Sequence, residues 1–469
     1  MIFKTIDELV DSQKFSVSLD GDSLRVIDRG KLEHSIDILV YNAVFASGLV
    51  RDTARWMIWE IGQEVGIYPA SIHELYVAAG KGKLPRPLTI PAINVRAMNY
   101  NTSRAIFRAA KKMDVGAMLF EIARSEMGYT AQRPSEYVSA VMGAAVKEGY
   151  RGPLFIQGDH FQVSAKGFAD DSDRELSAVR ELIAESIEAG FYNIDIDTST
   201  LVDLSYESLD KQQETNYTLC AELTRYVREC EPDQITISLG GEIGEVGGYN
   251  STVPELRAFM AGYLDKIGDS TGISKISVQT GTSHGGVVLP DGTLAQVSVD
   301  FDTLGELSRI SREEYGLGGA VQHGASTLPP VAFDKFPEAA AIEIHLATNF
   351  QNIIYDNLPE NIVQSAYNYI VENHKGEWKE GKTEEQFIYS TRKKAIGPFK
   401  QEWWDVDQTV KDELGRVLQN EFEFLFEKLN VAGTQMFVKE YTTLVEQHRP
   451  RPISAVEEGE LEIAADLAD

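Results

Sequence analysis

Basic residues are scarce in this chain compared with acidic ones. Its 469 residues include 44 Lys and Arg against 72 Asp and Glu, which gives a formal net charge of −28 at pH 7. Such a chain repels nucleic acid and anionic lipid at long range, so we expect neither nucleic acid nor a membrane surface as a partner. A local positive pocket for a small phosphate is compatible with this charge.

Long apolar runs, a secretory signal and paired cysteines are missing as well. No apolar run reaches 18 residues, and the start, MIFKTIDELVDSQKF, has no basic segment followed by an apolar core. The two cysteines, Cys220 and Cys230, lie on one predicted helix, whose rise separates them by roughly 15 Å, too far for a disulfide. We therefore expect a reduced, cytoplasmic protein without a membrane span.

The middle of the chain has a clear rhythm, in which short β-rich runs alternate with segments of helical period such as TSRAIFRAAKKM (102–113). Strands that alternate with helices indicate a parallel sheet, and eight strands over about 260 residues are typical of a (β/α)₈ TIM barrel. A doubly wound sheet usually has fewer strands and a Gly-rich first loop, whereas RAMNYNTS follows the first run here. The eight predicted strands are 88–95, 116–122, 153–160, 191–197, 234–242, 274–281, 319–324 and 342–348.

The two ends of the chain do not follow this rhythm. We expect an N-terminal accessory region at 1–86, an α/β barrel as catalytic domain at 87–356, and a helical C-terminal extension with an acidic tail at 357–469. The extension has an apolar stripe between Val410 and Leu429. This stripe either mediates self-association or packs on its own barrel, and we expect a homo-oligomer.

Three of the eight histidines stand at the ends of predicted barrel strands, where a barrel places its active site. They are His160, His284 and His323. Neutral imidazoles around one point, with an open fourth position, are the ligand set of a catalytic Zn²⁺. Acidic residues nearby would orient the ligands or act as general acid and base.

His345 belongs to a run, IEIHLAT, whose alternation places Glu343, His345 and Ala347 on one face. If that face points into the barrel, His345 contacts substrate or metal; the alternative is a buried histidine bonded to a neighbour. Small or hydroxyl residues also follow the last three strands, where barrels tend to bind phosphate, although tight turns explain them too. These residues are Gly285, Gly324, Ser326 and Thr348.

Taken together, these strand ends resemble the class II, metal-dependent ketose-bisphosphate (fructose-bisphosphate) aldolases. The resemblance covers about residues 86–356 and rests on seven motifs in the right order. They are LTIPAINV, GDH, IDTS, GGEIGEVGG, SHGG, QHGAS and the Ala-Thr pair of the last strand.

The resemblance implies one catalytic Zn²⁺, or another divalent metal, bound by His160, His284 and His323, with Glu242 and Asp197 near it. It implies that Asp159 handles the proton of the substrate's C4 hydroxyl. The phosphate of a fructose-1,6-bisphosphate-like sugar would be held by Gly285, Gly324, Ser326 and Thr348. The implied reaction is reversible aldol cleavage through the enediolate of dihydroxyacetone phosphate.

The sequence departs from that family at three places. His345 stands where the family usually has Asn, no Lys follows His284 within a few residues, and residues 249–252 replace an acidic cluster. The GDH motif also resembles that of the metal-free companion subunits of tagatose-bisphosphate aldolases. A non-catalytic companion subunit and a different metal-dependent sugar-phosphate lyase or epimerase are therefore the alternatives. Retention of the three histidines and Asp159 favours an aldolase.

Overall fold

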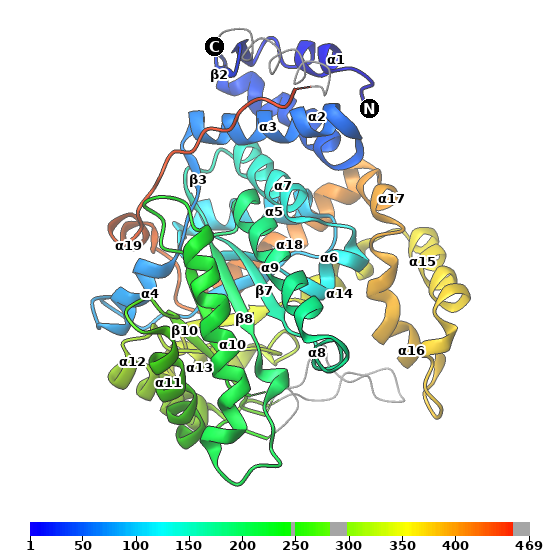
Figure 1. The fold of residues 1–469 in the computed structure, drawn as a ribbon. Helices are drawn as coiled ribbons and strands as arrows, with labels where there is room; N and C mark the ends of the chain where they lie inside the picture. The colour runs from blue at the N-terminus through cyan, green and yellow to red at the C-terminus, as the bar shows by residue number, and fades with distance from the viewer. Residues whose placement is uncertain (245–248, 282–297, 454–469) are drawn as a thin grey trace.

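A closed barrel of eight parallel strands lies at the centre of the computed structural model (Figure 1). The structure describes residues 1–244, 249–281 and 298–453. Each predicted strand overlaps one barrel strand, so the predicted (β/α)₈ barrel is confirmed. The strands are β4 (Ile90–Asn94), β5 (Leu119–Ala123), β7 (Ile156–Gln162), β8 (Asn193–Asp197), β9 (Ser238–Glu242), β10 (Lys275–Val278), β11 (Ala320–Gln322) and β12 (Glu343–Leu346).

The strands follow one another around the barrel in chain order. β12 pairs with β4, with Glu343 opposite Ile90 and His345 opposite Ala92, and this pairing closes the ring between the last strand and the first. Because all strands run in the same direction, their carboxyl ends meet at one mouth of the barrel. Side chains at these ends therefore gather from distant parts of the sequence.

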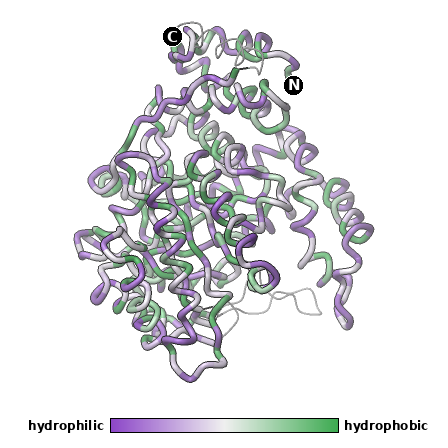
Figure 2. The backbone as a smooth tube through the Cα atoms, viewed as in Figure 1, coloured by the Kyte–Doolittle hydropathy of each residue, from purple (hydrophilic) through white to green (hydrophobic). Residues whose placement is uncertain are grey.

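An outer layer of helices covers the barrel, and Figure 2 shows hydrophobic stretches among the central strands. On α5, Ala105, Ile106, Ala109 and Ala110 are buried, as the period of the sequence predicts. α9 ends at Gly190, whose φ of 109° suits glycine. The helices are α5 (Asn99–Met113), α6 (Arg124–Thr130), α7 (Pro134–Lys147), α8 (Ala165–Asp170), α9 (Ser172–Ala189), α10 (Leu209–Cys230), α11 (Val253–Ile267), α12 (Phe301–Tyr315), α13 (Lys335–Glu338) and α14 (Thr348–Asn357).

The N-terminal residues form a helical layer against one side of the barrel. β1 and β2 form an antiparallel hairpin, and β3 pairs in parallel with β6 (Gly152–Leu154), which directly precedes β7. α3 packs against α2 and α7 and buries Trp56 and Trp59. The elements are α1 (Ile6–Asp11), β1 (Val17–Asp20), β2 (Ser23–Val26), α2 (Arg29–Phe45), α3 (Gly48–Val65), β3 (Ile67–Pro69) and α4 (His73–Gly80).

The apolar stripe of the C-terminal region lies on α18 (Gln408–Lys428), which packs against α5 and α14 of the same chain. Leu414, Leu418 and Phe422 are completely buried there. Of the two interpretations of this stripe, packing on its own barrel is therefore correct, and the stripe gives no support for self-association. The other helices are α15 (Glu360–Asn373), α16 (Glu384–Thr391), α17 (Lys400–Trp404) and α19 (Gln435–Glu440), with the 3₁₀ turn η4 (Arg392–Ala395) after α16.

After α19, residues 441–453 run back across α3 as an extended segment, drawn in orange-red in Figure 1. Trp56 Nε1 donates a hydrogen bond to the Arg449 carbonyl at 2.9 Å, and Trp59 Nε1 donates to the Gln447 carbonyl at 2.6 Å. The Arg449 guanidinium also stacks on the ring of Trp59. Residues 441–453 are thus attached to the N-terminal region through α3.

Two sequence-based exclusions concern the helices. Within the described ranges, none of the helices combines the length and the hydropathy needed to cross a membrane. Cys220 and Cys230 lie on α10 as free thiols, as their spacing predicts.

Candidate active site

A cavity of about 480 Å³ opens at the carboxyl ends of the barrel strands. Asn94, Asp159, Asp197 and Glu242, near the ends of β4, β7, β8 and β9, line it. His323 and Thr348 follow β11 and β12 and line it as well. This volume is large enough for a small phosphorylated sugar.

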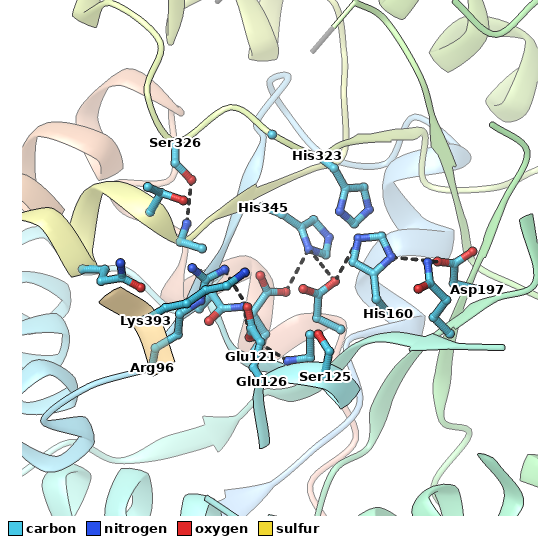
Figure 3. Close-up of a pocket in the computed structure, with 18 of the residues that line it drawn as sticks. Arg96, Glu121, Ser125, Glu126, His160, Asp197, His323, Ser326, His345 and Lys393 are labelled. Atoms are coloured by element: carbon cyan, nitrogen blue, oxygen red, sulfur yellow. Dashed lines mark hydrogen bonds and ion pairs between the residues drawn. The ribbon is translucent and has the colours of Figure 1, made fainter. Parts of the chain in front are cut away.

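Two of the three predicted metal histidines face each other in this cavity (Figure 3). The ring centroids of His160 and His323 are 4.3 Å apart. The Ser277 hydroxyl lies 3.0 Å from His323 Nε2 and orients that ring. The third histidine, His284, and the neighbouring phosphate candidate Gly285 lie outside the described residues.

His160 has a special backbone conformation, with φ of 41°. It lies in β7 where the register to β8 shifts between Gly158 and Phe161. Such irregularities turn a side chain away from the regular alternation of a strand, and they concentrate at functional sites. The shift therefore accounts for a histidine directly after Asp159 that also reaches the cavity.

Carboxylates surround His160. Its Nδ1 is 3.0 Å from Asp197 Oδ2 and 3.5 Å from Glu242 Oε2. Burial would lower the pKa of His160, but Asp159, Glu242 and Asp197 raise it well above its usual value. Burial and the charge of Asp197 raise the pKa of Glu242. Although burial opposes this, hydrogen bonds from His160, Ser199 and Gln162 hold the pKa of Asp197 low.

Asp159 and His345 meet beside this group. His345 Nδ1 lies 3.2 Å from Asp159 Oδ1 and 3.0 Å from Glu121 Oε2. The ring of His345 stacks on that of His323, with centroids 4.0 Å apart. Glu343 and His345 both point into the barrel, so His345 belongs to the cavity and is at the same time bonded to its neighbours.

Below the cavity lies a buried charge network that the sequence analysis did not identify. Lys275 Nζ is 2.8 Å from Asp195 Oδ1, 2.5 Å from Glu343 Oε1 and 2.7 Å from Gln157 Oε1. Lys275 is completely buried. A lysine within the apolar run SKISVQTG was the available signal, because a buried lysine needs carboxylate partners.

The described phosphate candidates lie together at the ends of β11 and β12. Gly324, Ser326 and Thr348 line the cavity, and Gly324 has φ of 71°. The backbone N–H of Ala347 donates to Ser326 Oγ at 2.7 Å. The turn thus brings small and hydroxyl side chains to one part of the wall.

Two cations that the sequence analysis missed, Arg96 and Lys393, line the same cavity, to the left of the histidines in Figure 3. Arg96 is 2.5 Å from Glu126 Oε1. Burial and the charge of Arg96 lower the pKa of Lys393. Arg96 comes two residues after the end of β4 and could have been found as a strand-end residue, whereas Lys393 comes from η4 in the C-terminal region.

The donor atoms of the cavity fit a divalent metal ion. Asp159, His160 and His323 each offer a ligand atom, and these atoms lie within 4.8 Å of one another. The same holds for His160, Asp197 and Glu242. Imidazole nitrogens with carboxylate oxygens suit Zn²⁺ and related ions.

Comparisons with known proteins agree with this geometry. A model of the family described as "Fructose-bisphosphate aldolase class-II" matches residues 72–402, more than half of the chain. Among curated protein sequences, none matched.

Among solved structures, a probable tagatose 6 phosphate kinase from Sinorhizobium meliloti 1021 is similar at 15% identity with a TM-score of 0.51, over 75% of this chain and 99% of that one. The fructose-bisphosphate aldolase from Campylobacter jejuni matches at 18% identity with a TM-score of 0.46, over 78% of this chain and 96% of that one. At 15% identity, the first likeness supports the fold alone.

Proposed function

The chain belongs to the class II fructose-bisphosphate aldolase family, and from this membership we propose that it makes or breaks a carbon–carbon bond in a ketose phosphate. The observation that carries the proposal is the meeting of Asp159, His160 and His323 in one cavity at the barrel mouth. His160 and His323, with Asp197 and Glu242 beside His160, are a donor set for a metal, and Asp159 adds a base. We expect the enzyme to work in the cytoplasm.

We assign the metal to His160 and His323, with His284 as the third expected ligand and Asp197 and Glu242 next to it. When bound, a Zn²⁺ or similar ion supplies Lewis-acid polarisation of the ketose carbonyl. Asp197 orients His160 through the 3.0 Å contact with its Nδ1.

Asp159 acts as general base in the cleavage direction. It takes the proton of the C4 hydroxyl as the C3–C4 bond breaks. C4 becomes the aldehyde carbon, and the electron pair of the broken bond moves toward the C2 carbonyl oxygen. In the condensation direction Asp159 returns the proton. Its burial beside the two histidines keeps bulk water from competing for that proton.

Two groups of residues in the cavity could bind the phosphate of the substrate. Gly324, Ser326 and Thr348 form one, with Gly285 expected beside them, and backbone N–H groups with hydroxyls suit a phosphate. Arg96 and Lys393 form the other. Groups that suit an anion thus come from two parts of the cavity wall, the ends of β11 and β12 and the end of β4 with η4, which favours a phosphorylated substrate.

A panel of ketose monophosphates and bisphosphates tests this proposal, with the released triose phosphate and aldehyde measured by coupled enzymes. We expect cleavage of at least one bisphosphate and weaker cleavage of the matching monophosphate. A metal-free protein that cleaves none of them would instead fit a companion subunit. Release of epimerised ketose without cleavage would favour an epimerase on the same barrel.

A further inference from the structure

Helix α4 of the N-terminal region is attached to the amino ends of the barrel strands, at the opposite end of the barrel from the cavity. Asn193, the first residue of β8, accepts a hydrogen bond from the Ile72 N–H at 2.9 Å and donates one to the Ala70 carbonyl at 3.2 Å. A Cβ atom on Gly80 would collide with the Leu317 carbonyl oxygen, so the end of α4 touches the backbone that precedes β11. These contacts fix the position of α4 at this end of the barrel.

Tyr76 on α4 reaches into the interior of the barrel. Its side chain is completely buried, and its hydroxyl donates a hydrogen bond to Glu343 Oε2. Glu343 is the first residue of β12 and is completely buried as well. Within the described part of the chain, Tyr76 is the hydrogen-bond donor to Oε2. Loss of the hydroxyl would leave this buried carboxylate oxygen without that partner, which is costly.

The other oxygen of Glu343 connects this contact to the cavity. Oε1 is 2.5 Å from Lys275 Nζ and accepts a hydrogen bond from Gln157 Nε2 at 2.9 Å. A carboxylate that pairs with an ammonium group is an acceptor, so His345 Nε2, which is 2.7 Å from Oε1, donates to it. The hydrogen bond at one ring nitrogen fixes the orientation of the imidazole.

The orientation of this ring determines what the cavity presents beside Asp159. Nδ1 of His345, on the other side of the ring, is 3.2 Å from Asp159 Oδ1 and 3.0 Å from Glu121 Oε2 (Figure 3). His345 thus lines the cavity next to the residue proposed as the general base. A rotation of the ring would change the surroundings of that base, and a misplacement of about 1 Å can lower a rate ~10²-fold.

We propose that Tyr76 is a positioning residue, which holds His345 in place in the cavity through Glu343. The contacts lead from α4 to the start of β12 and from there to the carboxyl end of the barrel. The effect on catalysis rests on the proposed function, whereas the contacts themselves do not. On this account the N-terminal region supports the active site, although no described residue of 1–86 lines the cavity.

Steady-state kinetics of the full-length protein with ketose bisphosphates test the effect on catalysis. Tyr76→Phe removes the hydroxyl and keeps the ring. We expect kcat to fall about 10-fold or more while KM stays similar, because the residues that bind the substrate are unchanged. Tyr150→Phe is the matched control and should keep the wild-type kcat. Tyr150 is also buried, and its hydroxyl donates to the Pro153 carbonyl at 2.9 Å, outside the cavity.

A double-mutant cycle shows whether Tyr76 acts through His345. In a His345→Asn background, Tyr76→Phe should change kcat little, since the residue that Tyr76 positions is gone. A fall of the same size in both backgrounds would show that Tyr76 acts by another route and would overturn the proposal. An equal loss in Tyr76→Phe and Tyr150→Phe would overturn it as well, because a general loss of stability would then explain both.

Proton NMR of the full-length chain supplies a readout that does not depend on activity. The imidazole N–H that donates to Glu343 should give a downfield signal, which is assigned by its absence in His345→Asn. We expect this signal to shift or broaden in Tyr76→Phe and to stay unchanged in Tyr150→Phe. An unchanged signal in Tyr76→Phe would overturn the proposal.

This inference and the proposed function fail separately. A wild-type chain that cleaves no ketose phosphate, with a His345 signal that responds to Tyr76→Phe, would overturn the aldolase proposal and leave the role of Tyr76 in place. A wild-type chain that cleaves a ketose bisphosphate, with the same kcat in Tyr76→Phe, would overturn the positioning role and leave the aldolase proposal in place.

Discussion

At the scale of single residues, the account depends most on Asp159. It lies in β7 of the barrel, is 6% exposed in the cavity, and contacts His345 at 3.2 Å. Its neighbour His160 is a proposed metal ligand. A carboxylate in this position lies close to any substrate bound there, so proton transfer and support of the metal are its two possible roles.

Replacing Asp159 by Asn keeps the shape of the side chain and removes its basicity. We expect kcat to fall at least ~10²-fold, because general bases contribute about this much, while KM stays similar. The ion at His160 and His323 should remain bound. Turnover near that of the wild type would contradict the assignment of the base, and loss of that ion with the activity would show a supporting role instead.

Replacing His323 by Ala removes one proposed metal ligand. We expect the ion at His160 and His323 to be lost on gel filtration while the far-UV circular dichroism spectrum stays unchanged, since the barrel core does not depend on this side chain. His34→Ala is the control, because His34 is exposed on α2, outside the cavity, and should keep the metal of the wild type. Unchanged metal content in His323→Ala would remove His323 from the ligand set.

The sequence made some of these residues predictable and others not. Asp159, His160 and His323 stand at the ends of β-rich runs, and the parallel barrel brings such positions together. Lys275 lies inside a strand run. Its role could not be inferred from the sequence, because it depends on the ion pairs that Lys275 forms with Asp195 and Glu343. Burial partners of this kind depend on strand register, which a single sequence does not reveal.

At the scale of elements, η4 brings a C-terminal lysine to the barrel mouth. Lys393 lines the cavity, whereas its neighbour Lys394 pairs with Glu377 at 2.6 Å. Lys393→Met should raise KM for a ketose bisphosphate about 10-fold or more, because a charge-assisted hydrogen bond contributes roughly 1.5–3 kcal/mol. Initial-rate kinetics with bisphosphate and monophosphate check this. Lys394→Met should change KM little, and equal effects of both variants would contradict a binding role for Lys393.

At the start of α4, His73 predicts a pH effect on stability. Burial, with Arg228 and Lys81, lowers the pKa of His73 to about 4. The unfolded chain then binds the proton more readily, so stability is complete above about pH 6.5 and falls as the pH drops toward 4. The loss from this residue reaches about 3 kcal/mol at most. Urea unfolding at several pH values measures it.

His73→Asn should flatten this pH dependence relative to the wild type, whatever its effect on stability at pH 7. His34→Asn is the matched control and should keep the wild-type slope, since His34 is exposed. Parallel curves for the wild type and His73→Asn would contradict the explanation.

Elements differ in how well the sequence predicted them. The eight strands were found because β-rich runs alternate with amphipathic helices. The apolar stripe on α18 was ambiguous. An apolar helix face is expected to be buried, but the sequence does not tell whether a second copy or the chain's own barrel covers it. The structure places it against α5 and α14.

At the scale of the whole molecule, the net charge of −28 contrasts with the cavity's Arg96 and Lys393. An acidic surface slows the approach of an anionic substrate, so specific cations at the barrel mouth matter more. The C-terminal region supplies one of them, and residues 441–453 attach the end of that region to α3. Parts outside the barrel thus contribute to the site.

The measurement that tests the central claim most directly is cleavage of ketose bisphosphates by the full-length protein, before and after treatment with a chelator. The account predicts release of triose phosphate that the chelator abolishes and that added Zn²⁺ restores, with Asp159→Asn inactive even after Zn²⁺ is added. Cleavage that persists without metal, or no cleavage by protein that holds its full metal content, would contradict it.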